Sequence, residues 1–151
     1  MDNIKKHLVE WVVNYIKNRD ILTREIEDIE EDKEGVDILI SLKDGKKQAV
    51  VVELEIKDLE RLKKFKGEKT VLYALNTEEN FDTLIKDWDN FAKFDAKFQM
   101  VFVNPFSKTD KRWTLFPMTH NSLTDKKALK PGLESLAANV ELITIEKIKK
   151  I

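Results

Sequence analysis

The residues best suited to chemistry in this sequence form a short alternating run of charged groups. Glu53, Glu55 and Lys57 occupy every second position directly after the apolar stretch 50–52. Successive side chains of a β-strand point to opposite faces, so these three groups are predicted to share one face of a strand. Carboxylates held this close together repel each other unless a positive charge lies between them.

Asp37 is predicted to reach the same place from the preceding strand. Residues 36–42 alternate in the manner of a strand, and Asp44-Gly45 supplies the turn of a hairpin that continues through residues 48–57. Pairing across this turn sets Asp37 opposite about residue 52, or nearer Glu53 if the register slips or bulges. Two or three carboxylates and an ammonium group are therefore expected in one small volume.

A divalent cation is the natural partner of such a cluster. The chain has no cysteine and two histidines, which excludes thiol catalysis and any cysteine-based or histidine-rich metal site. Carboxylate oxygens suit Mg²⁺, Mn²⁺ or Ca²⁺. A bound metal lowers the pKa of its water and stabilises phosphoryl charge, while Lys57 helps to orient or deprotonate that water. The chemistry expected of the cluster is phosphodiester hydrolysis.

The elements that must position these residues alternate between helices and strands. The first helix is predicted over residues 3–18, where apolar residues recur at helical spacing. Apolar runs bounded by turns predict further strands at 24–30, 70–75, 98–103, 113–116 and, at an edge, 142–145. Caps and turns predict further helices at 59–65, closed by Gly67, from Thr77 to 91, and from Pro131 to 138, with a frayed tail at 146–151. This order predicts an α/β fold with a mixed central sheet flanked by helices.

The size and composition of the chain favour one well-ordered domain. It has 151 residues, enough for a single core, and its richness in charged residues without cysteine resembles proteins from hot environments. The N-terminal segment carries Lys5, Lys6 and Glu10 among its apolar residues, and no stretch is long enough to cross a bilayer. We therefore expect no signal peptide, no membrane partner and a cytoplasmic location.

Binding to nucleic acid would have to rest on local patches, because the net charge is −1. One basic patch follows the acidic cluster, and a second lies in a loop ahead of Trp113, which is a candidate for stacking on a base. Each patch has a structural alternative, namely a solvated helix face and a tryptophan in the core. The candidate nucleic-acid contacts are Arg61, Lys63, Lys64, Lys108, Lys111 and Arg112.

Three other residues are assigned structural roles. Trp11 and Trp88 lie on the apolar stripes of predicted helices and are expected to pack in the core. His120 is a candidate general base, but the sequence favours a structural role for it.

An aspartate in the first strand of a hairpin, followed by three apolar residues and Glu-x-Glu in the second, resembles the PD-(D/E)XK nuclease superfamily. The segments that carry the resemblance are 35–40 and 50–57, within a core of about residues 3–103. The resemblance implies a restriction-endonuclease-like αβββαβ core, with residues 104–151 as a C-terminal extension. It also implies Mg²⁺ or Mn²⁺ as cofactor, DNA as partner and a homodimer.

The resemblance assigns the site residues as follows. Asp37 and Glu53 are metal ligands, joined by Glu55 and by the backbone carbonyl of Leu54, and Lys57 assists the water. A glutamate from the first helix belongs to the site in many family members, but Glu10 lies almost opposite the apolar stripe of its helix and is left out.

The motif departs from the usual pattern at one position. If Glu53 is the motif acid, Glu55 occupies the place of the lysine, whereas a shifted frame makes the triplet Glu55-Ile56-Lys57. The departure keeps open an inactive nuclease-like fold that serves as a nucleic-acid-binding or protein-assembly module. A third alternative is a protein-interaction domain that does not bind nucleic acid. In that case the alternating charged residues simply form the solvent-exposed face of an amphipathic strand.

Overall fold

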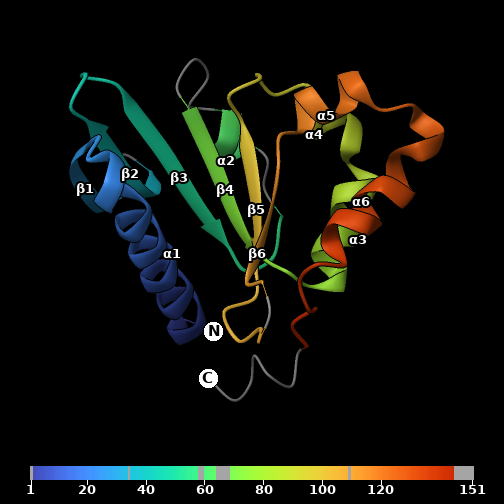
Figure 1. Ribbon diagram of the computed structural model, residues 1–151, viewed down its shortest axis with the longest axis horizontal. Coiled ribbons are helices and arrows are strands. Elements are labelled where there is room, and N and C mark those ends of the chain that lie inside the picture. The colour runs from blue at the N-terminus through green and yellow to red at the C-terminus, as the bar shows by residue number, and fades with distance from the viewer. Residues whose placement is uncertain (1, 34, 58–59, 64–68, 109, 145–151) are drawn as a thin grey trace.

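A mixed sheet of six strands forms the centre of the protein (Figure 1). The structure is a computed structural model that describes residues 2–33, 35–57, 60–63, 69–108 and 110–144. The strands follow each other across the sheet in chain order: β1 (Ile26–Lys33), β2 (Val36–Leu42), β3 (Lys47–Glu53), β4 (Lys69–Leu75), β5 (Gln99–Val103) and β6 (Arg112–Leu115).

The strand directions bring several chain segments together at one end of the sheet. β1, β2 and β3 are mutually antiparallel, β3, β4 and β5 are parallel, and β6 runs antiparallel to β5. β3, β4 and β5 therefore finish at the end where β2 and β6 begin, which we call the carboxyl end.

Helices cover both faces of the sheet. α1 (Asp2–Thr23) lies on one face, and α3 (Glu78–Lys86), α4 (Trp88–Ala92) and α6 (Leu129–Ala137) lie on the other (Figure 1). Alternate residues of β3 serve the two layers, since Val50 packs with the α1 layer and Val51 with the opposite one. The remaining helices are α2 (Glu60–Lys63), α5 (Pro117–Leu123) and the 3₁₀ turn η1 (Lys126–Ala128).

This arrangement confirms the predicted α/β class and mixed sheet, but several boundaries were wrong. α1 runs five residues beyond the predicted end, to Thr23, and the strand predicted to reach Lys57 ends at Glu53. The long helix predicted after Thr77 is two helices, because the backbone at Asp87 leaves helical geometry with φ −101° and ψ 19°.

The C-terminal part of the chain differs most from the predictions. α5 was not foreseen, and α6 begins at Leu129 instead of Pro131. Residues 142–144 form no strand, and Ile143 instead donates its N–H to the Asn76 carbonyl over 2.9 Å. Gly67, Ile145 and the predicted tail lie outside the described residues. Within the described ranges no helix is both long and apolar enough to cross a membrane.

Candidate functional site

The hairpin turn fixes how β2 and β3 face each other. Gly45 adopts φ 88°, a left-handed conformation that glycine adopts without steric cost, and donates its N–H to the Leu42 carbonyl over 3.0 Å. Beyond this turn Ile38 pairs with Val50. Antiparallel partners advance in opposite directions, so Asp37 falls opposite Val51, one residue short of the predicted partner.

The two carboxylates lie at the same end of neighbouring strands, but different layers of the protein hold them. Glu53 stands in one row with Ala74 and Phe102, which pack in the layer beneath α3 and α4. Val36 packs in that same layer, and Asp37, the next residue, contacts Lys5 on α1, the helix on the other face. The pair lies at the carboxyl end, where β2 begins and β3 finishes.

The Asp37 carboxylate is held by two groups that belong to different elements. Its Oδ2 accepts a hydrogen bond from the Val52 N–H over 2.7 Å, just beyond the last described pair of the ladder. Its Oδ1 lies 3.1 Å from the Lys5 ammonium nitrogen on α1, and only 12% of the Asp37 side chain is exposed. Lys5 thus supplies a positive charge that was expected from Lys57 or from a cation.

Glu53, Glu55 and Lys57 do not share one strand face, so that prediction was wrong. Glu53 is the partly buried last residue of β3, and the chain bends directly after it. Glu55 and Lys57 face solvent, with 61% and 73% of their side chains exposed, and form an ion pair with each other at 3.5 Å. The two groups therefore leave the sheet, while Glu53 stays with it.

Asn80, a residue that sequence reasoning missed, causes the bend. Its side chain is buried in the first turn of α3, where it accepts a hydrogen bond from Ile56 N–H over 2.9 Å. The same amide donates to the carbonyls of Leu54 and Leu75 over 2.9 and 2.8 Å. It thereby joins the ends of β3 and β4. An asparagine near the start of a helix gives no sign of such partners in the sequence.

Two further buried asparagines at the carboxyl end have structural partners. Asn76 donates to the carbonyls of Val140 and Glu141 over 3.2 and 3.0 Å, and its oxygen accepts from the Trp113 indole N–H over 2.9 Å. Asn104 also donates to the Glu141 carbonyl, over 2.8 Å. These amides hold the C-terminal segment against the sheet.

Trp113 belongs to the core, which confirms the structural alternative to base stacking. It is 5% exposed, and its ring lies parallel to that of Phe102 with the centroids 4.4 Å apart. The alternation of β6 turns it inward, while the neighbouring Arg112 is exposed. Lys108 and Lys111 are exposed as well. Arg61 and Lys63 lie on α2, and Lys64 is outside the described residues.

The expected structural roles of Trp88 and His120 agree with their surroundings. Trp88 is 4% exposed and donates its indole N–H to the Asn121 side chain over 2.9 Å. The His120 ring meets the Trp88 ring edge-on at 5.7 Å, and its buried Nε2 has no hydrogen-bond partner among the described residues. Burial holds the pKa of His120 below its ordinary value.

The residues around Asp37 fit a hard divalent cation in their chemistry. In the part of the chain that the structure describes, no three or more acids or histidines gather as a metal site. Mg²⁺ is often held by only one or two carboxylates together with water and substrate phosphate, so two carboxylates are enough in number and type. A cation would have to compete with Lys5 for the Asp37 oxygen.

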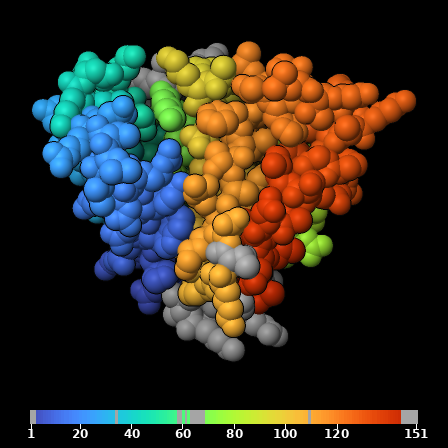
Figure 2. All heavy atoms as spheres, viewed as in Figure 1, coloured from blue at the N-terminus to red at the C-terminus, as the bar shows by residue number. Residues whose placement is uncertain are grey.

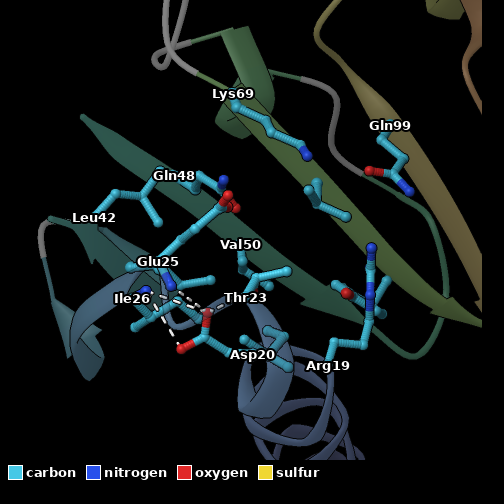
Figure 3. A pocket seen from close by; sticks show the side chains of 14 residues that line it. Arg19, Asp20, Thr23, Glu25, Ile26, Leu42, Gln48, Val50, Lys69 and Gln99 are labelled. Atoms are coloured by element: carbon cyan, nitrogen blue, oxygen red, sulfur yellow. Dashed lines mark hydrogen bonds between the residues drawn. The ribbon is translucent and has the colours of Figure 1, made fainter. Parts of the chain in front are cut away.

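A second polar site lies at the opposite end of the strands (Figure 3). A pocket of about 190 Å³ opens between the C-terminal half of α1 and the sheet. Lys69 and Gln99 point into it from the starts of β4 and β5 (Figure 3). Tyr73 also lines the pocket, and burial raises the pKa of its hydroxyl to about 12. The pocket is separate from Asp37 and Glu53, which lie at the carboxyl end.

Comparisons of the chain with protein-family models, with curated proteins and with solved structures find no match. The function is therefore inferred from the fold, the strand register and the contacts at the carboxyl end.

Proposed function

We propose that this protein is a divalent-metal-dependent phosphodiester hydrolase that acts on nucleic acid, with DNA as the expected substrate. The observation that carries the proposal is that Asp37 and Glu53 lie on the neighbouring strands β2 and β3 at the carboxyl end of the sheet. The element order α1, β1, β2, β3, α2, β4 supports it, because the resemblance to PD-(D/E)XK nucleases implies the same αβββαβ order.

In this proposal Asp37 and Glu53 hold Mg²⁺ or Mn²⁺, assisted by the Leu54 carbonyl. When bound, the metal activates a water molecule and stabilises charge on the phosphate oxygens. Lys5 occupies the Asp37 carboxylate through their 3.1 Å contact, and the metal would take its place there. Glu55 and Lys57 face solvent as a pair, so we do not count them among the metal ligands or the groups that orient water.

The proposal is tested by cleavage of single-stranded and duplex DNA with Mg²⁺ or Mn²⁺. Asp37→Asn and Glu53→Gln should each lose more than the roughly 10–100-fold typical of residues that only orient a metal ligand. Glu55→Gln should stay close to wild type, and the exposed Glu27→Gln on β1 is the matched surface control. Cleavage that persists unchanged in both Asp37→Asn and Glu53→Gln would refute the assignment.

A second candidate is a nuclease-like fold without chemistry that binds nucleic acid or assembles with other proteins. It is favoured by the commitment of the Asp37 carboxylate to Lys5 and to the Val52 N–H. Calorimetric titration with Mn²⁺ separates the two candidates. Binding that disappears in Asp37→Asn supports the hydrolase, while salt-dependent DNA binding without any Mn²⁺ binding supports the second candidate.

A homodimer formed through the free edge of β1 is not part of the proposal. Glu27, Asp28 and Glu31 are exposed along this strand, and Asp32 adopts φ 52° near its end. Acidic side chains on an edge strand repel a second copy of the same strand, so β1 is protected against pairing.

A further inference from the structure

One row of side chains on α1 combines aromatic rings with a cation. His7, Trp11, Tyr15 and Arg19 follow each other at intervals of four, the spacing that aligns side chains along a helix. The Trp11 and Tyr15 rings are nearly parallel, with the centroids 5.2 Å apart and an angle of 10°. The His7 ring lies parallel to that of Phe106 at 6.1 Å, so the row faces the segment between β5 and β6.

Cations from α1 and from the start of β6 meet the aromatic row. The Arg112 guanidinium lies 5.0 Å from the Tyr15 ring centroid, and that of Arg19 lies 5.5 Å from it. Trp11, Tyr15, Lys111 and Arg112 line a pocket of about 440 Å³ together with Asp110. We call these residues and Arg19 the aromatic groove. Figure 2 shows α1, in blue, beside the orange segment that contains β6 on one face of the molecule.

The tryptophan of the groove differs from the two tryptophans of the core. Trp88 and Trp113 are 4% and 5% exposed, and each donates its indole N–H to an asparagine side chain. Trp11 is only partly buried, and its indole N–H has no acceptor in the part of the chain that the structure describes. Trp11 packs against the core cluster on the α1 face, as expected, and the exposed part of its ring borders the groove.

Partly exposed aromatic rings beside cations are the combination that binds unpaired bases and their phosphates. We propose that the aromatic groove binds single-stranded nucleic acid, with a base stacked on the exposed part of Trp11 and with Tyr15 supporting the Trp11 ring from its other side. Lys111 and Arg112, which line the pocket, contact the phosphates, and Arg19 adds a positive charge beside the Tyr15 ring. Asp110 is the one acidic residue of the lining. A duplex is disfavoured because its bases are already paired and stacked.

The position of the groove links it to the candidate site. A role for the groove as a substrate channel rests on the proposed function. Glu53 pairs with Ala74, Ala74 with Phe102 and Phe102 with Trp113, so these residues form a row across β3 to β6. Three steps of about 4.8 Å set the strand bearing Arg112 about 14 Å from Glu53 along the carboxyl end. A single strand held in the groove would continue along this end to the acidic pair.

The test is the binding of a labelled oligo(dT) of about 15 nucleotides, followed by fluorescence anisotropy with EDTA present so that no cleavage occurs. Trp11→Ala and Tyr15→Ala should each weaken binding about tenfold, and Trp11→Phe should recover most of the loss. Arg112→Gln should reduce the slope of log K against log salt by about 0.7. Lys127→Gln, an exposed charge on η1, is the matched control and should bind as wild type.

A second readout checks that the bases contact Trp11 itself. The oligonucleotide should quench tryptophan emission in wild type but not in Trp11→Phe, because Trp88 and Trp113 are buried. Tighter binding to a duplex of equal length, or unchanged oligo(dT) binding by folded Trp11→Ala and Tyr15→Ala, would overturn the inference.

The proposed binding by the groove and the proposed hydrolase activity can be refuted independently of each other. In Asp37→Asn the binding of oligo(dT) should still depend on Trp11, because Asp37 does not line the groove. Trp11-dependent binding by a protein that never cleaves DNA would support the groove while refuting the hydrolase. Cleavage by a protein whose binding does not depend on Trp11 would overturn the groove alone.

Discussion

Replacing Asn80 by alanine tests how the end of β3 is held. The side chain is 1% exposed, and it makes three hydrogen bonds to backbone groups of Leu54, Ile56 and Leu75. Each bond contributes about 0.5–1.5 kcal/mol net, and buried partners left unpaired add to the loss. The Leu54 carbonyl is partly exposed and can bind water instead, so we expect the free energy of unfolding to fall by about 3 kcal/mol.

Urea denaturation followed by circular dichroism measures this loss. With an m-value of about 2 kcal/mol per molar urea, the midpoint should fall by about 1.5 M. The matched control is Asn90→Ala, which removes an exposed asparagine from α4 and should change stability by less than about 0.5 kcal/mol. An Asn80→Ala variant as stable as this control would show that other contacts hold the bend after Glu53.

Two other residues give predictions that the same unfolding assay checks. Burial depresses the pKa of His120 in the folded state below about 6.5, so the unfolded chain binds the proton more readily. Stability is therefore lost as the pH falls through that value, and His120→Phe should lessen this loss between about pH 7.5 and 5.5. Lys5→Met should destabilise the fold by about 1–2 kcal/mol, because it removes the ammonium group that lies 3.1 Å from the mostly buried Asp37 carboxylate. Lys6→Met should cost less than about 0.5 kcal/mol, and equal losses in both lysine variants would contradict a specific role for Lys5.

The parts of the fold that depend on local patterns were predictable from the sequence. Asp44-Gly45 predicted the hairpin, and Gly45 has the left-handed backbone that such turns use. Thr77 was predicted as an N-cap, and its hydroxyl accepts the Asn80 N–H over 3.1 Å. Signals of this kind involve residues close together in the chain, where propensity and pattern are informative.

The candidate site depends on contacts between distant residues, which explains the errors. The bend after Glu53 requires Asn80, which bonds to Ile56 from 24 residues away. The cation beside Asp37 comes from Lys5 on α1, a residue that reads as an ordinary surface lysine. The apolar stripe that contains Trp11 shows which side of α1 faces the core. How much of Trp11 is exposed depends on how closely the segment between β5 and β6 approaches α1.

The most direct measurement is a crystal structure of the protein grown with Mn²⁺, with diffraction data collected at the manganese edge. We predict an anomalous peak at coordination distance from oxygens of both Asp37 and Glu53, with the Lys5 ammonium displaced from Asp37. A fully folded protein in which Lys5 keeps its contact and no manganese lies between the two carboxylates would contradict the proposed metal site.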